Sequence, residues 1–174
     1  EDDTTNSFPP LDRGPTEVDR MVITFTETSS SVNPYIDSAV AVDPDGPGGN
    51  PPEIRDTLKL DWLDALNREI FYQAEIKLFN AGERVDSIVR GNAESFIVCF
   101  RDFQTREINL LDRDLDADGV PLGLESDWST DGDPSSTSGV NSIRVTLNYQ
   151  PLRKDGLCDA GVRILEINLP YRLL

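Results

Sequence analysis

The sequence contains no histidine, and its 174 residues include only two cysteines and one methionine. Without histidine the chain cannot form a Ser/His/Asp or Cys/His catalytic triad, and zinc, copper and haem sites lose their most common nitrogen ligand. No apolar run approaches the roughly 20 residues that a membrane-spanning helix needs. Metal sites built from oxygen ligands, and chemistry that uses carboxylates alone, remain open.

Basic residues are also few, since 16 Lys and Arg stand against 32 Asp and Glu, for a net charge of −16. This charge repels phosphate backbones and anionic membrane surfaces, so nucleic acid is excluded as a partner. It suits a surface that faces cations, basic proteins or polar glycans. A charge that serves only solubility explains the same numbers, so the charge balance by itself selects no function.

Alternation of apolar and polar residues is the strongest pattern in the chain. In 143–149 and in 165–171 every second residue is apolar, which places those side chains on one face of a β-strand. In 36–42 the apolar positions are Ile36, Val40 and Val42, which predicts that these side chains face a core. The same alternation indicates further strands at 21–25, 58–62, 70–78 and 96–100, and a weaker one at 106–111.

Helical spacing is confined to one stretch, which predicts a single short helix near 82–91. Segments 43–52 and 126–139 are rich in Pro, Gly, Asp and Ser and predict loops. About eight strands joined by such loops predict an all-β fold, an antiparallel β-sandwich of the Ig-like or jelly-roll-like kind. We expect residues 16–174 to form this one domain and the polar segment 1–15 to be a flexible tether.

An acidic stretch beginning at residue 114 matches the ligand spacing of a calcium loop, with a glycine, Gly119, at its sixth position. Pro121 at the eighth position and the lack of flanking amphipathic helices argue against an EF-hand. We therefore expect a structural Ca²⁺-binding turn in a β protein, with a metal-free acidic hairpin as the open alternative. The candidate metal ligands are Asp114, Asp116, Asp118 and Glu125.

A second acidic turn, Asp43-Pro44-Asp45-Gly46, also offers two carboxylates at a sharp bend. Its composition fits an ordinary β-turn equally well, so both interpretations stay open.

The two cysteines, Cys99 and Cys158, lie in a predicted strand and in a predicted turn. In an oxidising compartment they could form a disulfide, which would stabilise the fold by about 4 kcal/mol on a chain-entropy estimate. The alternative is a small core residue and an unrelated loop thiol.

Trp128 stands beside Asp127 in a polar stretch that follows the acidic loop. Exposed aromatic side chains are common platforms for sugars and peptides, so we take Trp128 and Asp127 as candidate ligand-binding residues. The alternative is an aromatic that covers one end of the core. Paired carboxylates are also numerous enough for a glycosidase, but nothing singles out one pair.

The segments DRDLDADGVPLGLESDWST (112–130) and SGVNSIRVTLNYQPLRKDGLCDAGVRILEINLP (138–170) carry a family resemblance. Here the chain resembles a group of small, largely uncharacterised surface lipoproteins of Bacteroidota. In that group an acidic NPLGL-like loop precedes an LTVTLxHxPxxKDG-like strand and turn. Members of the group often carry histidine where this chain has 94–95 and 148–150, so a histidine-dependent metal site does not carry over.

The resemblance implies an extracytoplasmic protein at the outer-membrane surface or in the periplasm, held by a lipid anchor and without a membrane span. It also implies a partner, namely an outer-membrane receptor of the TonB-dependent kind or another surface protein. Our leading expectation is a non-enzymatic surface lipoprotein that binds a ligand or partner as an accessory. The alternatives are a structural or filament subunit that assembles by strand addition and a small carbohydrate-active enzyme with paired carboxylates.

Overall fold

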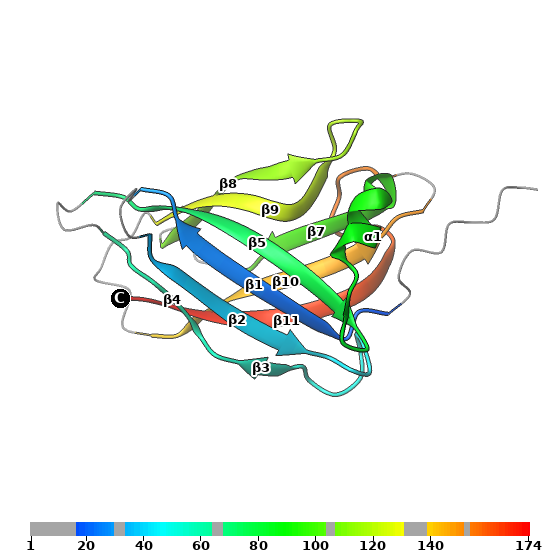
Figure 1. Ribbon diagram of the computed structural model, residues 1–174, viewed down its shortest axis with the longest axis horizontal. Helices are drawn as coiled ribbons and strands as arrows, with labels where there is room; N and C mark the ends of the chain where they lie inside the picture. Colours follow the sequence, from blue (N-terminus) through cyan, green and yellow to red (C-terminus); the bar gives the residue numbers. More distant parts are fainter. Residues whose placement is uncertain (1–16, 30–33, 64–67, 104–106, 131–138, 152–153) are drawn as a thin grey trace, which may run out of the picture.

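The computed structural model describes residues 17–29, 34–63, 68–103, 107–130, 139–151 and 154–174, so the predicted tether 1–15 lies outside the described residues. The described chain is an all-β sandwich with eleven strands and one short α-helix (Figure 1). The strands are β1 (Arg20–Glu27), β2 (Ile36–Val42), β3 (Glu53–Arg55), β4 (Leu58–Leu60), β5 (Phe71–Asn80), β6 (Glu83–Arg84), β7 (Phe96–Arg101), β8 (Ile108–Leu115), β9 (Pro121–Thr130), β10 (Asn141–Tyr149) and β11 (Val162–Leu173). The helix α1 (Asp86–Gly91) and a 3₁₀ turn (Ala93–Ser95) precede β7.

Two sheets form the layers of the sandwich. The larger sheet has the order β3-β2-β1-β5-β9-β8, with β6 paired to β5, and the smaller sheet has the order β4-β11-β10-β7. Figure 1 shows β1, β2 and β5 in front of β10 and β11. All pairs between these strands are antiparallel except β4 with β11, which is parallel. The predicted antiparallel sandwich is therefore confirmed, with one parallel pair added.

The predicted alternation builds the core between the sheets. In β10 and β11 the buried residues lie directly opposite each other, as in Ile143 with Leu169 and Val145 with Ile167. In β5 every second residue from Tyr72 to Leu78 is buried, as the sequence predicted. The short helix α1 lies inside the predicted range 82–91 and buries Val89.

The prediction for the inward face of β2 was wrong. Ile36 is 58% exposed, and Val40 and Val42 lie half-buried on the outer face, while Ala39 and Ala41 are fully buried. The register explains the inversion, because these alanines lie opposite large buried residues of β1 and small side chains fit there.

The prediction of a loop over 126–139 was also wrong in its first part, since 126–130 belongs to β9, a strand between β5 and β8. Polar residues hid this strand, because Ser126, Ser129 and Thr130 are all buried. Residues 131–138 lie outside the described part of the chain.

At one side of the sandwich β9 approaches β7 of the opposite sheet very closely. Gly123 has φ +85°, and a Cβ atom at this position would lie 2.6 Å from the carbonyl oxygen of Val98. Only glycine fits this position, for both reasons. The close approach places the β8–β9 hairpin above the edge of the smaller sheet, where the candidate site lies.

Candidate functional site

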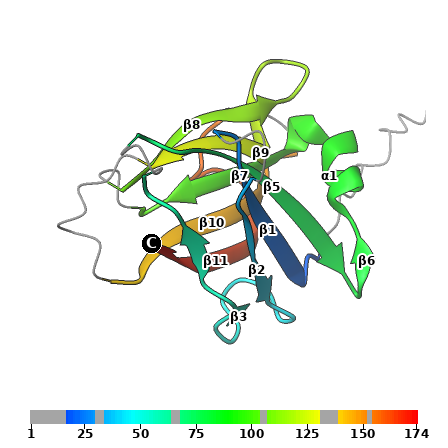
Figure 2. The ribbon, with the colours of Figure 1, turned by 60° about the vertical axis from the view of Figure 1, so that its left-hand side comes forward.

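The β8–β9 hairpin carries the acidic stretch that the sequence singled out, and its turn extends away from the sheets (Figures 1 and 2). The turn closes at Asp116 and Val120, where the Asp116 N–H donates to the Val120 carbonyl over 2.9 Å. Asp116 Oδ1 accepts the N–H groups of Asp118 and Val120 at 3.0 and 2.8 Å. The aspartate spacing therefore first serves to organise the turn itself.

Asp114 and Glu125 face each other across the hairpin and share one cation, Arg90 of α1. The Arg90 guanidinium lies 3.3 Å from Asp114 Oδ2 and 2.8 Å from Glu125 Oε1. Asp114 Oδ1 also accepts the backbone N–H groups of Gly123 and Glu125 at 2.7 and 3.0 Å. Two of the four candidate metal ligands are therefore already paired with one arginine of the protein.

Asp116 forms a buried ion pair with Lys154. The Lys154 Nζ lies 2.8 Å from Asp116 Oδ2, and both side chains are 2% exposed. Lys154 Nζ also donates to the carbonyl oxygens of Ala93 and Val120 at 3.0 and 3.3 Å. Burial raises the pKa of Asp116, but Lys154 and the backbone N–H groups together outweigh it and hold the pKa below its ordinary value.

The described side chains therefore do not form the predicted calcium loop. Asp114 and Glu125 contact an arginine, Asp116 contacts a lysine, and Asp118 is exposed on the turn. Within the described ranges there is no group of three or more Asp, Glu or Cys side chains arranged to hold a metal ion. Calcium binding by this protein stays a prediction, without support from this hairpin.

Trp128 is not an exposed platform, so this part of the ligand-site prediction was wrong. It is 1% exposed and packs against Phe25, Phe100 and Phe103, with ring centroids 5.8, 5.2 and 5.2 Å away. Its Nε1–H donates to Ser126 Oγ over 2.8 Å, which satisfies the buried indole. Trp128 stabilises the core.

Asp127, the other candidate, is exposed and lines a hollow of about 210 Å³ on the outer face of the larger sheet. The hollow is lined by Gln73 of β5, by Asp112–Asp114 of β8 and by Glu125–Asp127 of β9. We call this hollow, defined by these residues, the acidic hollow.

Acidic residues oppose each other twice in the strand register of this region. Glu75 lies opposite Glu125, and Asp112 lies opposite Asp127. Like charges directly across a strand pair destabilise a sheet. The first pair is compensated, because Arg90 binds Glu125 and Lys77 lies 3.3 Å from Glu75.

The second pair lacks such compensation in the described part of the chain, where no ion pair reaches Asp112 or Asp127. Among the described residues Asp112 Oδ1 accepts the neighbouring N–H of Arg113, and the Arg113 guanidinium donates to the Val98 carbonyl over 3.4 Å. Burial lowers the pKa of Arg113, an effect that Asp114 and Asp112 oppose. The acidic hollow therefore presents two facing carboxylates to solvent.

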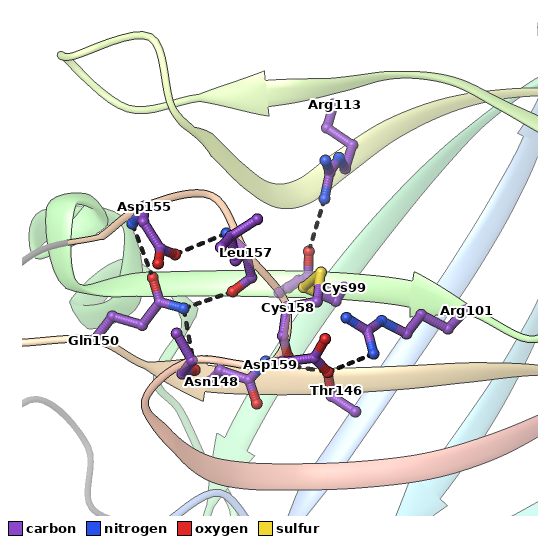
Figure 3. Close-up of a disulfide and its surroundings, with 12 residues drawn as sticks. Cys99, Arg101, Arg113, Thr146, Asn148, Gln150, Asp155, Leu157, Cys158 and Asp159 are labelled. Carbon is purple, nitrogen blue, oxygen red and sulfur yellow. Dashed lines mark hydrogen bonds and ion pairs between the residues drawn. A yellow bond between two sulfur atoms is a disulfide. The ribbon is translucent and has the colours of Figure 1, made fainter.

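Lys154 lies in the segment between β10 and β11. Figure 3 shows Asp155, Leu157 and Cys158 of this segment close to Gln150 and Cys99. A disulfide joins Cys99 of β7 to Cys158 of this loop, with Cα atoms 5.8 Å apart. Gln150 Nε2 donates to the carbonyl oxygens of Leu157 and Ala160, and Asn148 Nδ2 donates to that of Cys158. The buried amides and the disulfide hold the loop against the smaller sheet.

The sequence did not indicate Arg90 and Lys154, the two basic residues that form ion pairs with the hairpin carboxylates. Lys154 lies in the KDG turn that carries the family resemblance, but nothing local indicates a partner 38 residues away. Arg90 lies in the last turn of a short helix, where a basic residue commonly faces solvent or the helix dipole.

No known family model matches the chain, no curated protein is significantly similar to it, and no solved structure matches it. The resemblance to lipoproteins of Bacteroidota therefore stays a prediction. Among the described residues no helix is both long and apolar enough to cross a membrane.

Proposed function

We propose that this protein is a non-enzymatic binding module of a cell surface, which takes a basic segment of a partner protein in the acidic hollow. The observation that carries this proposal is the pair of Asp112 and Asp127, which lie opposite each other in the strand register, both line the hollow and form no ion pair with a described residue. Two carboxylates that repel each other across a strand pair gain most from a Lys or Arg side chain placed between them. The net charge of −16 adds long-range attraction for the same partners.

The compartment we propose is extracytoplasmic, with a lipid anchor at the outer-membrane surface. The disulfide between Cys99 and Cys158 supports an oxidising environment, where such bonds persist. The resemblance to surface lipoproteins supports the anchor and suggests an outer-membrane receptor or another surface protein as the partner. The fold itself adds nothing to this choice, because a sandwich serves many functions.

The proposal is tested by titrating the purified protein with a fluorescent Lys/Arg-rich peptide and measuring its anisotropy. The expected result is binding that weakens steeply with salt and that falls by about tenfold in the double variant Asp112→Asn/Asp127→Asn. The matched control is Glu69→Gln/Glu83→Gln, which removes the same charge from two exposed residues outside the acidic hollow. Equal losses in both double variants would show that only net charge attracts the peptide and would refute the site.

A second candidate function is a subunit that assembles by strand addition, as the edge strand β8 exposes two apolar side chains, Leu111 at 53% and Leu115 at 56%. Two register irregularities in β8 weaken this candidate, since bulges protect edges from pairing. Size-exclusion chromatography over a wide concentration range separates the two functions. A ladder of oligomers that Leu111→Lys abolishes favours the subunit, and a constant monomer favours the binding module.

A further inference from the structure

The other acidic turn, between β2 and β3, contains a buried aspartate, Asp43. Asp43 is 2% exposed, and its backbone N–H donates to the Asp19 carbonyl over 2.8 Å. Its Oδ1 is buried and has no hydrogen-bond partner among the described residues. A buried carboxyl oxygen without a hydrogen-bond partner lowers the stability of the fold. We therefore expect a further group, such as a bound ion or a proton, to satisfy this oxygen.

A second carboxylate is fixed beside Asp43. Asp45 Oδ2 accepts the backbone N–H and the Nδ2–H of Asn50 at 2.8 and 2.7 Å, which orients its carboxylate and lowers its pKa. Gly49 permits this packing, because a Cβ atom there would lie 2.5 Å from the Asp45 carboxyl group. Burial raises the pKa of Asp43, the charge of Asp45 and a hydrogen bond between the two side chains raise it further, and the backbone N–H of Gly46 lowers it.

Both aspartates line a hollow of about 510 Å³, and two further acids, Glu17 and Asp19, line it as well. The basic residue in its lining is Arg163, whose guanidinium is paired with Glu166 of β11. The hollow therefore has room for a hydrated ion, and its lining includes four acidic residues, among them Asp43.

We propose that Asp43 and Asp45 bind a calcium ion at this hollow. The ion would give the buried Oδ1 of Asp43 a partner and remove the repulsion between the two carboxylates. Calcium accepts flexible sets of oxygen ligands that include backbone carbonyls and water, so two carboxylates suffice for a weak site of the kind found in extracellular modules. Such a site differs from a cluster of three or more acidic side chains, which the described residues do not form.

The test measures the midpoint of thermal unfolding of the full chain after EDTA treatment, with Ca²⁺ added to about 10 mM. The expected result is a rise of about 3–8 °C, because Ca²⁺ bound only to the native state stabilises it. Asp43→Asn and Asp45→Asn should both lose this rise. Asp118→Asn, an exposed aspartate of the other acidic turn, is the matched control and should keep it.

Isothermal titration with Ca²⁺ keeps the proposal falsifiable if Asp43→Asn fails to fold, since the exposed Asp45 tolerates substitution more readily. Saturable binding that Asp45→Asn weakens at least tenfold supports the site. Absence of a thermal shift in the wild-type protein, or an equal shift in Asp45→Asn and Asp118→Asn, overturns it. In that case a proton held by Asp43 satisfies the buried oxygen instead.

Discussion

The two acidic turns of this protein have similar compositions but differ in whether their carboxylates form ion pairs with the protein. In the β8–β9 hairpin Asp114 and Glu125 form ion pairs with Arg90, and Asp116 forms an ion pair with Lys154. In the 43–50 turn Asp43 is equally buried but retains an unpartnered oxygen beside Asp45. The hairpin matches the calcium-loop pattern far better in sequence, yet the buried carboxyl oxygen without a hydrogen-bond partner among the described residues belongs to the other turn. The spacing of acidic residues therefore predicts a metal site only if no basic residue from elsewhere in the chain forms ion pairs with them.

The comparison also separates two uses of negative charge. In the hairpin, carboxylates fix the positions of the helix α1 and of the loop that carries Lys154. At the acidic hollow Asp112 and Asp127, and at the 43–50 turn Asp43 and Asp45, form no ion pair with a described residue. We assign the first group to stability and the second to binding.

The largest expected effect comes from breaking the disulfide that holds the Lys154 loop. The double variant Cys99→Ser/Cys158→Ser should lose about 4 kcal/mol of unfolding free energy, since the bridge closes a loop of 59 residues in the unfolded chain. Urea denaturation of the variant and of the wild type measures the loss. A loss below about 1 kcal/mol would mean that Gln150 and Asn148 hold the loop without the bridge.

Next in size is the buried ion pair of the hairpin. Lys154→Met should cost about 3 kcal/mol, because it leaves the Asp116 carboxylate buried without its cation. The double variant Lys154→Met/Asp116→Asn should recover most of that loss, since the amide oxygen still accepts the turn N–H groups. Urea denaturation measures both, and an equal cost in the single and double variants would contradict a charge-based explanation.

A smaller effect is expected at Arg90, which is 36% exposed. Arg90→Met should cost about 0.5–1 kcal/mol, and added salt should reduce the difference from the wild type, because solvent screens exposed ion pairs. The variant also makes the hairpin more like the 43–50 turn, because Asp114 and Glu125 lose their ion pairs with Arg90. If it then gains a Ca²⁺-dependent rise in the unfolding midpoint, the arginine alone keeps the metal from the hairpin.

The smallest effect concerns Asp43 in EDTA-treated protein. Its pKa in the folded state lies above the ordinary value of 3.8, so its contribution to stability is fully present below pH 3.8 and is lost as pH rises through the raised pKa. Asp43→Asn should remove this part of the pH dependence. Unfolding midpoints of the two proteins should therefore differ in their slopes between pH 4 and neutrality, and parallel curves would contradict the raised pKa.

Most of the strands could be predicted because their side chains alternate. The alternating residues of β5, β10 and β11 are apolar, and each of these strands lies where the alternation placed it. Strand β9 was not predicted in full, because its buried serines and threonine are residue types typical of loops. For the same reason Trp128 was predicted to be exposed, whereas it is buried. In β2 the apolar residues lie on the outer face, so hydropathy indicated the wrong side.

The sequence by itself determined the fold class, the short helix and the strongly acidic character, because alternation, helical spacing and charge are local or summed properties of the chain. It allowed a disulfide but did not decide it, since bridging depends on the distance between β7 and a loop 59 residues away. Only the tertiary structure decided which carboxylates are neutralised. An ion pair forms only when the two charged groups lie within about 4 Å of each other. Packing brought Arg90 and Lys154 to the β8–β9 hairpin and no ion-pairing cation from the described residues to Asp43.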